Sequence, residues 1–318
     1  MVVKDPYEAI SQPNQKNVKA QAFLHEAGLN FTVGKVPLCN PLRPHRRIKG
    51  FYAIIRQDTL DVLAVVRDRY TVVQNQELAS LIDYIAEIES IRILRCGSIG
   101  KGERWFMLLE WEENHIDVGA DRVQKQVLIM GSHDAKNSNK IRITPLRLAS
   151  RSSLLLPIKG FPYEWSLRHT PKVKERVADA KRLVKRSADY FGRFQEVAAR
   201  MAAREVASKK ADRTIHRAVS QWWGRRSPQK TIDSISQEIL DLFLGFQGAD
   251  QPQGIPGTAW GLLVAGAEYA DQRLIRSRVP KGSTPEDQLF KSLMDGQRFK
   301  LKRAMAHSIG QELGDFTE

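Results

Sequence analysis

The chain is short of cysteine, of long apolar runs and of acidic residues. Cys39 and Cys96 are its only cysteines, which argues against a disulfide-rich secreted scaffold and indicates a reducing compartment. No run of about 18 apolar residues occurs, so no membrane-spanning helix is expected. The first residues, Met1–Pro6, lack a signal-peptide pattern. The sequence therefore predicts a cytoplasmic protein with no membrane partner.

Motifs for catalysis and for metal or cofactor binding are also missing. His133, Asp134 and His169 are residue types that a Ser/His/Asp triad uses, but no G-x-S-x-G turn presents a nucleophile. Their spacing also matches no metal-ligand motif. The glycines of Gly97–Gly102 lie between two β-type runs, whereas a phosphate-binding glycine loop opens a helix. We therefore predict a hairpin turn there, and no enzyme activity, metal or cofactor.

Basic residues are what the chain has in excess. Fifty Lys and Arg residues stand against 36 Asp and Glu, a formal net charge of +14. Between residues 171 and 230 there are 17 basic and 6 acidic residues, so most of the excess lies in one segment. A clustered basic surface attracts polyanions, of which nucleic acid is the commonest. The alternative is a solvated basic helix without such a partner.

Hydropathy patterns predict an α+β fold in three parts. Residues 1–49 are expected to form a flexible arm with one short helix and a basic loop at residues 43–49. Residues 50–210 are expected to form the core domain. It begins with a β-hairpin, in which Thr71–Val73 prolongs the second strand. A helix capped by Asn75 comes next, and at least three antiparallel strands then run to residue 144. Residues 211–318 are expected to form a helical C-terminal domain.

A long basic helix is predicted at residues 172–208. This segment lacks proline, and its apolar residues recur at steps of three and four, as on one face of a helix. The apolar stripe is longer than one small sheet can cover, and stable proteins rarely leave such stripes exposed. The sequence therefore predicts a homo-oligomer.

Five short motifs carry a family resemblance. They are Arg69–Asn75 (RYTVVQN), Gly102–Phe106 (GERWF), Gly131–Asp134 (GSHD), Arg147–Leu154 (RLASRSSL) and Arg168–Thr170 (RHT). In this order and spacing they resemble phage- and plasmid-borne proteins that carry a domain of unknown function. The resemblance covers roughly residues 50–310 and implies a family without an activity.

The chain departs from the family pattern at four positions. Ala135 stands where the family has a glycine, which puts a tight turn after Asp134 in doubt. Ser150, Ser152 and Ser153 stand where the family has Cys, Asn and Thr, which weakens any reading of the cysteine as a nucleophile or ligand.

The order of elements is similar to the core of single-strand annealing proteins of the Redβ, RecT, Erf and eukaryotic Rad type. This similarity implies a single-stranded DNA-binding protein that promotes ATP-independent strand annealing and recombination, assembled as a ring or helical filament. One alternative is an accessory protein of a mobile element that binds a host protein in defence or counter-defence. Another is a DNA-binding regulator.

Arginine and lysine interleaved with small hydroxyl residues suit contacts to backbone phosphates. Trp222 and Trp223 are further candidates, for base stacking or a partner contact, whereas Trp105 in an apolar strand is expected in the core. The predicted nucleic-acid contacts are Lys101, Arg104, Lys140, Arg142, Arg147, Arg151, Arg168, His169, Lys172, Lys174, Arg176, Lys181, Arg182 and Lys185.

Overall fold

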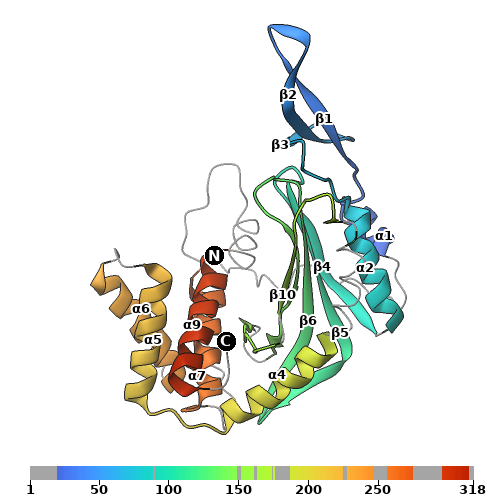
Figure 1. Cartoon of the computed structure of the whole chain (residues 1–318). Helices are drawn as coiled ribbons and strands as arrows, with labels where there is room; N and C mark the ends of the chain where they lie inside the picture. Colours follow the sequence, from blue (N-terminus) through green and yellow to red (C-terminus); the bar gives the residue numbers. More distant parts are fainter. Residues whose placement is uncertain are drawn as a thin grey trace, which may run out of the picture.

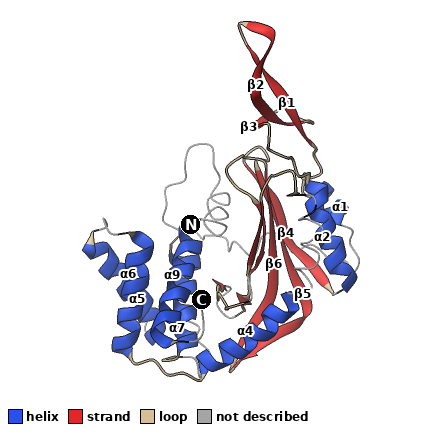
Figure 2. Ribbon diagram, in the orientation of Figure 1, coloured by secondary structure: helices blue, strands red, loops and turns tan. Residues whose placement is uncertain are grey.

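The computed structural model combines two antiparallel sheets with helices from both ends of the chain (Figures 1 and 2). It describes residues 20–88, 90–148, 152–160, 163–173, 175, 187–224, 228–245, 256–274 and 296–314. The flexible segment predicted at the extreme N-terminus lies outside these residues. The helices and strands are α1 (Ala20–Glu26), β1 (Val33–Asn40), β2 (Arg43–Arg56), β3 (Val62–Arg67), α2 (Asn75–Ile88), β4 (Ile91–Ile99), β5 (Arg104–Val118), β6 (Asp121–Ser132), β7 (Asn139–Ile143), β8 (Leu146–Arg147), β9 (Ser152–Ser153), β10 (Glu164–Leu167), α4 (Ser187–Ala202), α5 (Ser208–Trp223), α6 (Gln229–Leu244), α7 (Ala259–Glu268), the π-helix η1 (Tyr269–Arg273) and α9 (Gln297–Leu313).

The smaller sheet, β1-β2-β3, extends away from the rest of the molecule (Figure 1). The predicted basic loop at residues 43–49 is wrong, because these residues are the first half of β2 and pair with β1. These residues lack the apolar–polar alternation that predicts a strand, because a projecting ribbon is exposed on both faces. The β1–β2 register shifts on either side of Cys39, and Gly50 beside the shift has a left-handed φ of +77°. Such an irregularity bends a ribbon and increases its twist.

The larger sheet has the order β10-β7-β6-β5-β4, with β8 and β9 paired at one end. Its antiparallel strands confirm those predicted between residues 91 and 144. The predicted hairpin turn is shorter than Gly97–Gly102: Gly97 is still in β4, paired with Phe106, and the turn starts at Gly100, where Gly100 and Gly102 have positive φ. Thr71–Val73 was expected to prolong the hairpin and is not a strand. The Thr71 amide instead donates to the His169 carbonyl (3.2 Å), so a tertiary contact takes the place of strand pairing.

Trp105 is fully buried, as expected for an apolar strand, and lies opposite Gly131 in the β5–β6 register. A Cβ atom at residue 131 would lie 1.9 Å from the Trp105 Nε1 atom. The indole therefore occupies the space that any larger residue would need. Glycine is required in this strand for close approach, not for its backbone freedom.

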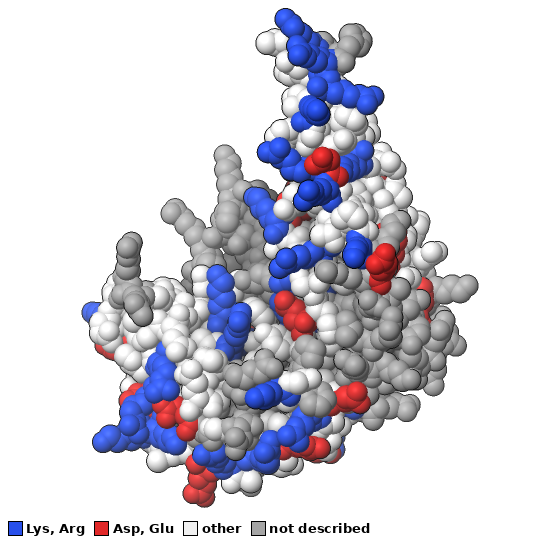
Figure 3. All heavy atoms as spheres, viewed as in Figure 1, with Lys and Arg blue, Asp and Glu red and all other residues white. Residues whose placement is uncertain are grey.

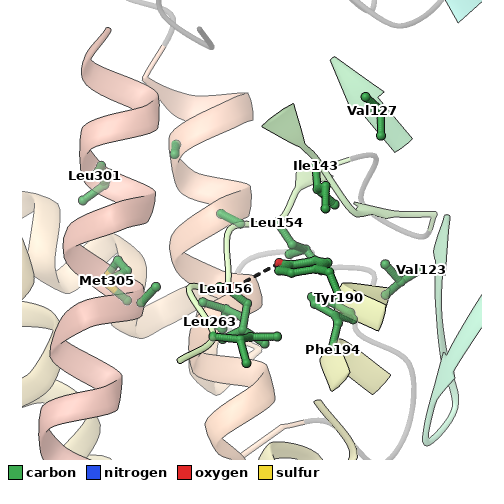
Figure 4. Close-up of a cluster of buried hydrophobic side chains, with 14 of the residues drawn as sticks. Val123, Val127, Ile143, Leu154, Leu156, Tyr190, Phe194, Leu263, Leu301 and Met305 are labelled. Atoms are coloured by element: carbon green, nitrogen blue, oxygen red, sulfur yellow. Dashed lines mark hydrogen bonds between the residues drawn. The ribbon is translucent and has the colours of Figure 1, made fainter. Parts of the chain in front are cut away.

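The sheet and the C-terminal helices share one hydrophobic core. Figure 4 shows Tyr190 of α4 between the strands and the helices, with its hydroxyl donating to the Leu156 carbonyl (2.9 Å). Val123 comes from β6 on one side, and Leu263 of α7 and Leu301 of α9 come from the other. All are buried. Helices α4 and α7 therefore contact the sheet directly, whereas α5 packs against α6 and α9, which in turn pack against α7.

The helix predicted at residues 172–208 is wrong at its C-terminal end, because α4 stops at Ala202 and α5 starts at Ser208. The intervening backbone is extended: the Val206 amide donates to the Gly257 carbonyl, and the Ala259 amide to the Arg204 carbonyl (2.7 and 2.9 Å). Tertiary hydrogen bonds thus end a helix that the periodicity would continue. Most of residues 174–186 lie outside the described residues.

The apolar stripe of α4 is covered by the chain itself. Phe191, Phe194, Ala198 and Met201 are all buried. The excess stripe from which a homo-oligomer was expected is therefore not present on the described part of this helix.

Helices α5, α6, α7 and α9 agree with the expectation of a helical C-terminal region, although α5 already begins at Ser208. Thr258 caps α7 by accepting a hydrogen bond from the Gly261 amide (3.1 Å). The helix then continues as η1. Within the residues that the structure describes, no helix is both long and apolar enough to cross a bilayer.

Candidate nucleic-acid interface

Residues 33–56, comprising β1, β2 and the turn between them, form a projecting basic hairpin that we call the β-arm. It contains six lysines and arginines, and from residue 27 to residue 57 the sequence has no Asp or Glu. Arg43, Arg46, Arg47 and Lys49 of this set are exposed. Figure 3 shows blue side chains along the outer part of the projection, with red side chains among the blue near its base and on the body. The β-arm therefore carries positive charge without internal compensation.

Two further arginines continue this charge toward the body of the molecule. Arg67 and Arg69 at the end of β3 are exposed. The Arg67 guanidinium carbon lies 4.0 Å from the centroid of the Phe51 ring, to which it is paired across strands. Stacking on the ring keeps the guanidinium extended while it remains charged. Arg67 thus lies along the same outward edge as the β-arm.

The base of the β-arm is attached to the body by its remaining two cations. The Lys35 ammonium donates to the carbonyls of Asp68 and Tyr70 (2.6 and 2.8 Å). Arg56 donates to the Lys101 carbonyl (3.0 Å) and lies over the Phe31 ring. These contacts hold the root, so the exposed cations project from a fixed base.

Of the predicted contacts, Arg142 and Arg147 lie in the interior. The Arg147 guanidinium is fully buried, 2.7 Å from Asp121 and 3.9 Å from Glu268. Arg142 is buried against Glu164, with Nε donating at 2.7 Å. Their burial removes both from the surface that a phosphate can reach. They serve as internal counter-ions for carboxylates from other strands and from α7.

The other predicted residues are scattered. Lys101 forms an exposed ion pair with Asp61 (2.6 Å), Arg104 lies 4.0 Å from Asp134, and Lys140 lies 3.3 Å from Glu164. Arg168 and Lys172 are exposed and His169 is half-buried. The residues that fall outside the described part of the chain are Arg151, Lys174, Arg176, Lys181, Arg182 and Lys185.

Three of the short sequence motifs meet beneath the β-arm in what we call the histidine cluster: Tyr70, Asn75, His133, Asp134 and His169. The Tyr70 and His169 rings stack with centroids 4.5 Å apart. His133 Nε2 lies 2.8 Å from Asn75 Oδ1, while Asn75 Nδ2 donates to the Leu29 carbonyl. Because the Asn75 amide is oriented by that second bond, His133 Nε2 carries the proton and Nδ1 is the unprotonated nitrogen. The prediction that Asn75 caps the helix is therefore wrong, because its side chain bonds Leu29 and His133 and not its own helix.

Burial governs titration in the histidine cluster. Desolvation lowers the pKa of His133 to about 4, with a smaller contribution from His169. Burial also lowers the pKa of His169. Burial would raise the pKa of Asp134, but hydrogen bonds from Ser132 and Asn137 outweigh it and lower the value. Both imidazoles are therefore neutral at pH 7 and add no positive charge beneath the β-arm.

The Ser132–Asn139 segment confirms the turn interpretation. Asp134 accepts hydrogen bonds from the amides of Lys136 and Asn137 (2.9 and 2.8 Å). Ala135 adopts a left-handed φ of +60°, so the tight turn is present despite the missing glycine. In the described residues no group of three or more His, Cys, Asp or Glu side chains could hold a metal ion.

The two adjacent tryptophans differ in environment. The Trp222 indole donates to the Gln297 side chain (2.8 Å), linking α5 to α9, while Trp223 is exposed and contacts Trp222 edge to face. One tryptophan is thus structural. The other is available for a partner contact.

The β-arm is the feature that sequence reasoning missed, because residues 43–49 were interpreted as a loop and given no role. The signal was present in the 31 consecutive residues without an acid. The absence of Asp and Glu over a short stretch identifies the β-arm, whereas the excess of Lys and Arg over residues 171–230 does not.

The comparisons with known proteins give a family and no activity. No curated protein and no solved structure matches the chain. A family model described as a domain of unknown function, DUF932, matches residues 62–294. The match starts at the first residue of β3, so the whole β-arm precedes it. Because it spans well over half of the 318 residues, the chain belongs to the DUF932 family.

Proposed function

We propose that this protein binds DNA through the β-arm and that single strands are its substrate, whose ATP-independent annealing it promotes for a phage or plasmid. The observation that carries the proposal is the concentration of exposed cations on a projecting hairpin that has no acidic residue. Arg43, Arg46 and Arg47 lie within five consecutive positions of one strand. Cations so placed neutralise backbone phosphates and release counter-ions, which is the main source of non-specific affinity.

The residue types on the β-arm favour contacts to the phosphate backbone of DNA. A β-arm whose exposed charged residues are arginine and lysine can hold phosphates and leave base edges unengaged. A strand held by its phosphates keeps its bases available to pair with a complement. The preference for single strands rests only on the order of elements expected from the sequence, and no solved structure matches the chain.

A specific feature favours a second candidate function, a DNA-binding regulator that uses duplex DNA. A two-stranded antiparallel ribbon has the width that the major groove of duplex DNA admits, and β1 and β2 form such a ribbon. A regulator would bind duplex more tightly than single strands.

The test is fluorescence anisotropy with labelled 30-mers of single-stranded DNA, duplex DNA and RNA, each titrated from low to high salt. We expect the tightest binding to single-stranded DNA and a steep loss of affinity with salt. Annealing of two complementary labelled strands, without ATP, should be accelerated by the protein. Tighter binding to duplex and no acceleration would establish the regulator instead. An absence of binding at low salt would leave an acidic host protein as the partner to seek.

A further inference from the structure

The end of the β-arm presents an apolar side chain at its outermost point. The β1–β2 turn consists of Pro41 and Leu42. Leu42 is 90% exposed, the highest value for any large hydrophobic residue in the described part of the chain. A single exposed leucine is common on protein surfaces, so what sets Leu42 apart is its place at the tip of the basic β-arm.

The turn also holds Leu42 in place. Asn40 and Arg43 pair directly across the hairpin, which leaves only the two turn residues between the strands. The Leu42 amide donates to the Asn40 side-chain carbonyl (2.9 Å), a contact that rigidifies turns. The leucine is therefore presented by an ordered tip, so little conformational entropy is lost when it is buried against a partner.

The surroundings of the tip define the chemistry of that partner. Arg43 follows Leu42 directly, and Arg46, Arg47 and Lys49 lie behind it on the same strand, all exposed. A partner that covers the leucine must therefore also be densely anionic. DNA combines both properties, because its phosphates flank apolar, stacked base faces. Architectural DNA-binding proteins insert leucine, isoleucine or proline wedges between base steps in this way.

We propose that Leu42 inserts between two adjacent stacked bases of the bound DNA while the cations of the β-arm hold the flanking phosphates. This inference rests on the proposed function, since it needs the β-arm to bind DNA. The additional claim is that the tip of the β-arm separates two neighbouring stacked bases. Local unstacking by the tip would expose base edges where strands begin to pair, or would kink a duplex at the point of contact.

The experiment uses DNA containing 2-aminopurine, whose fluorescence rises when it is unstacked, as a single strand in one arm and as a duplex in the other. Binding is followed in parallel by anisotropy. Leu42→Ser removes the apolar tip and keeps every charge. Leu60→Ser is the matched control, because Leu60 is 75% exposed on the β2–β3 turn of the same sheet and does not lie at the tip.

The wild type and Leu60→Ser should raise 2-aminopurine fluorescence at least about twofold on binding. Leu42→Ser should lose most of that rise, while its affinity falls no more than about threefold because the phosphate contacts remain. A rise confined to duplex or to single strands identifies which form is opened. If Leu42→Ser keeps the full signal, or if the wild type binds without any rise, the wedge is wrong and the DNA-binding proposal stands. If the wild type does not bind at all, the proposed function fails first.

Discussion

The β-arm and the body of the molecule use arginine in opposite ways. On the β-arm, Arg46 and Arg47 are exposed in a stretch that contains no acid. In the body, Arg142 and Arg147 are buried against Glu164 and Asp121, which lie more than 20 positions away along the chain. An arginine in a stretch without acids can therefore be exposed, as on the β-arm, or paired with an acid from elsewhere in the chain, as in the body. The local sequence alone does not distinguish the two cases.

The largest effect should come from breaking a body arginine. Arg147→Ala leaves Asp121 and Glu268 buried without their counter-ion and should lower the free energy of unfolding by about 3–5 kcal/mol. Urea denaturation measures the loss. The matched β-arm change, Arg46→Ala, should leave stability unchanged. If Arg147→Ala unfolds like the wild type and binds DNA less tightly, the division between the two regions is wrong.

The histidine cluster should make the body, and not the β-arm, sensitive to acid. An unfolded histidine takes up a proton near pH 6.5, whereas buried His133 does so only near pH 4. Between these values the unfolded state binds more protons, so stability falls as pH falls from 6.5 to 4 and is unaffected above. The loss should be on the order of 3 kcal/mol.

Urea midpoints measured at half-unit pH steps would test this, with His133→Gln as the variant whose slope should be shallower. DNA affinity of the folded protein should hold across the same range, because the arginines of the β-arm do not titrate there. A stability curve that is flat from pH 7 to pH 4.5 would contradict the burial of His133.

Removing charge from the β-arm should weaken DNA binding without unfolding. Arg43→Ala, Arg46→Ala and Arg47→Ala together should lower affinity about 10- to 100-fold near physiological salt. The slope of log affinity against log salt should fall by roughly 2–3 units, one for each lost phosphate contact.

The control for this triple variant removes three exposed cations from α5 and α6, Lys209, Arg213 and Lys230, by the same change to alanine. It has the same net charge and should keep most of the affinity. Equal losses in the two triple variants would show that overall charge, and not the β-arm, attracts the DNA.

The smallest effect should be a gain. Ala135 has a left-handed φ of +60°, a conformation that costs a residue with a Cβ about 1–2 kcal/mol and glycine little. Ala135→Gly should therefore raise stability by about 1 kcal/mol after the entropy that glycine adds to the unfolded chain. Thermal melting measures the gain, and DNA affinity should not change. A lower melting temperature would show that the turn is not strained.

The central sheet was predictable because its strands alternate with clear turn signals and are buried where they are apolar. Trp105 and the helix beginning at Asn75 followed from the same patterns. The first half of β2 was not predictable in this way, since a strand exposed on both faces has no apolar period. The end of α4 at Ala202 depends on hydrogen bonds to residues 257 and 259, which no local pattern contains.

The candidate site likewise has a part that the sequence predicts and a part that depends on contacts in the folded chain. The sequence predicted a site of basic residues, but the burial of Arg147 follows from Asp121 and Glu268, which reach it only in the folded chain. His133 and Asn75 lie 58 positions apart and hydrogen-bond beneath the β-arm. Their motifs could be recognised in the sequence, but their meeting could not.

The absence of a side chain at Gly131 helps to specify the register of β5 and β6. Only alignment of Gly131 with Trp105 leaves room for the indole; a slip of two residues keeps the same face inward but sets Ile129 or His133 against it. Such a slip preserves the hydrophobic pattern that otherwise specifies register, so a steric signal is needed to reject it. A β5–β6 pairing in the wrong frame therefore places a side chain in the space that the Trp105 indole occupies.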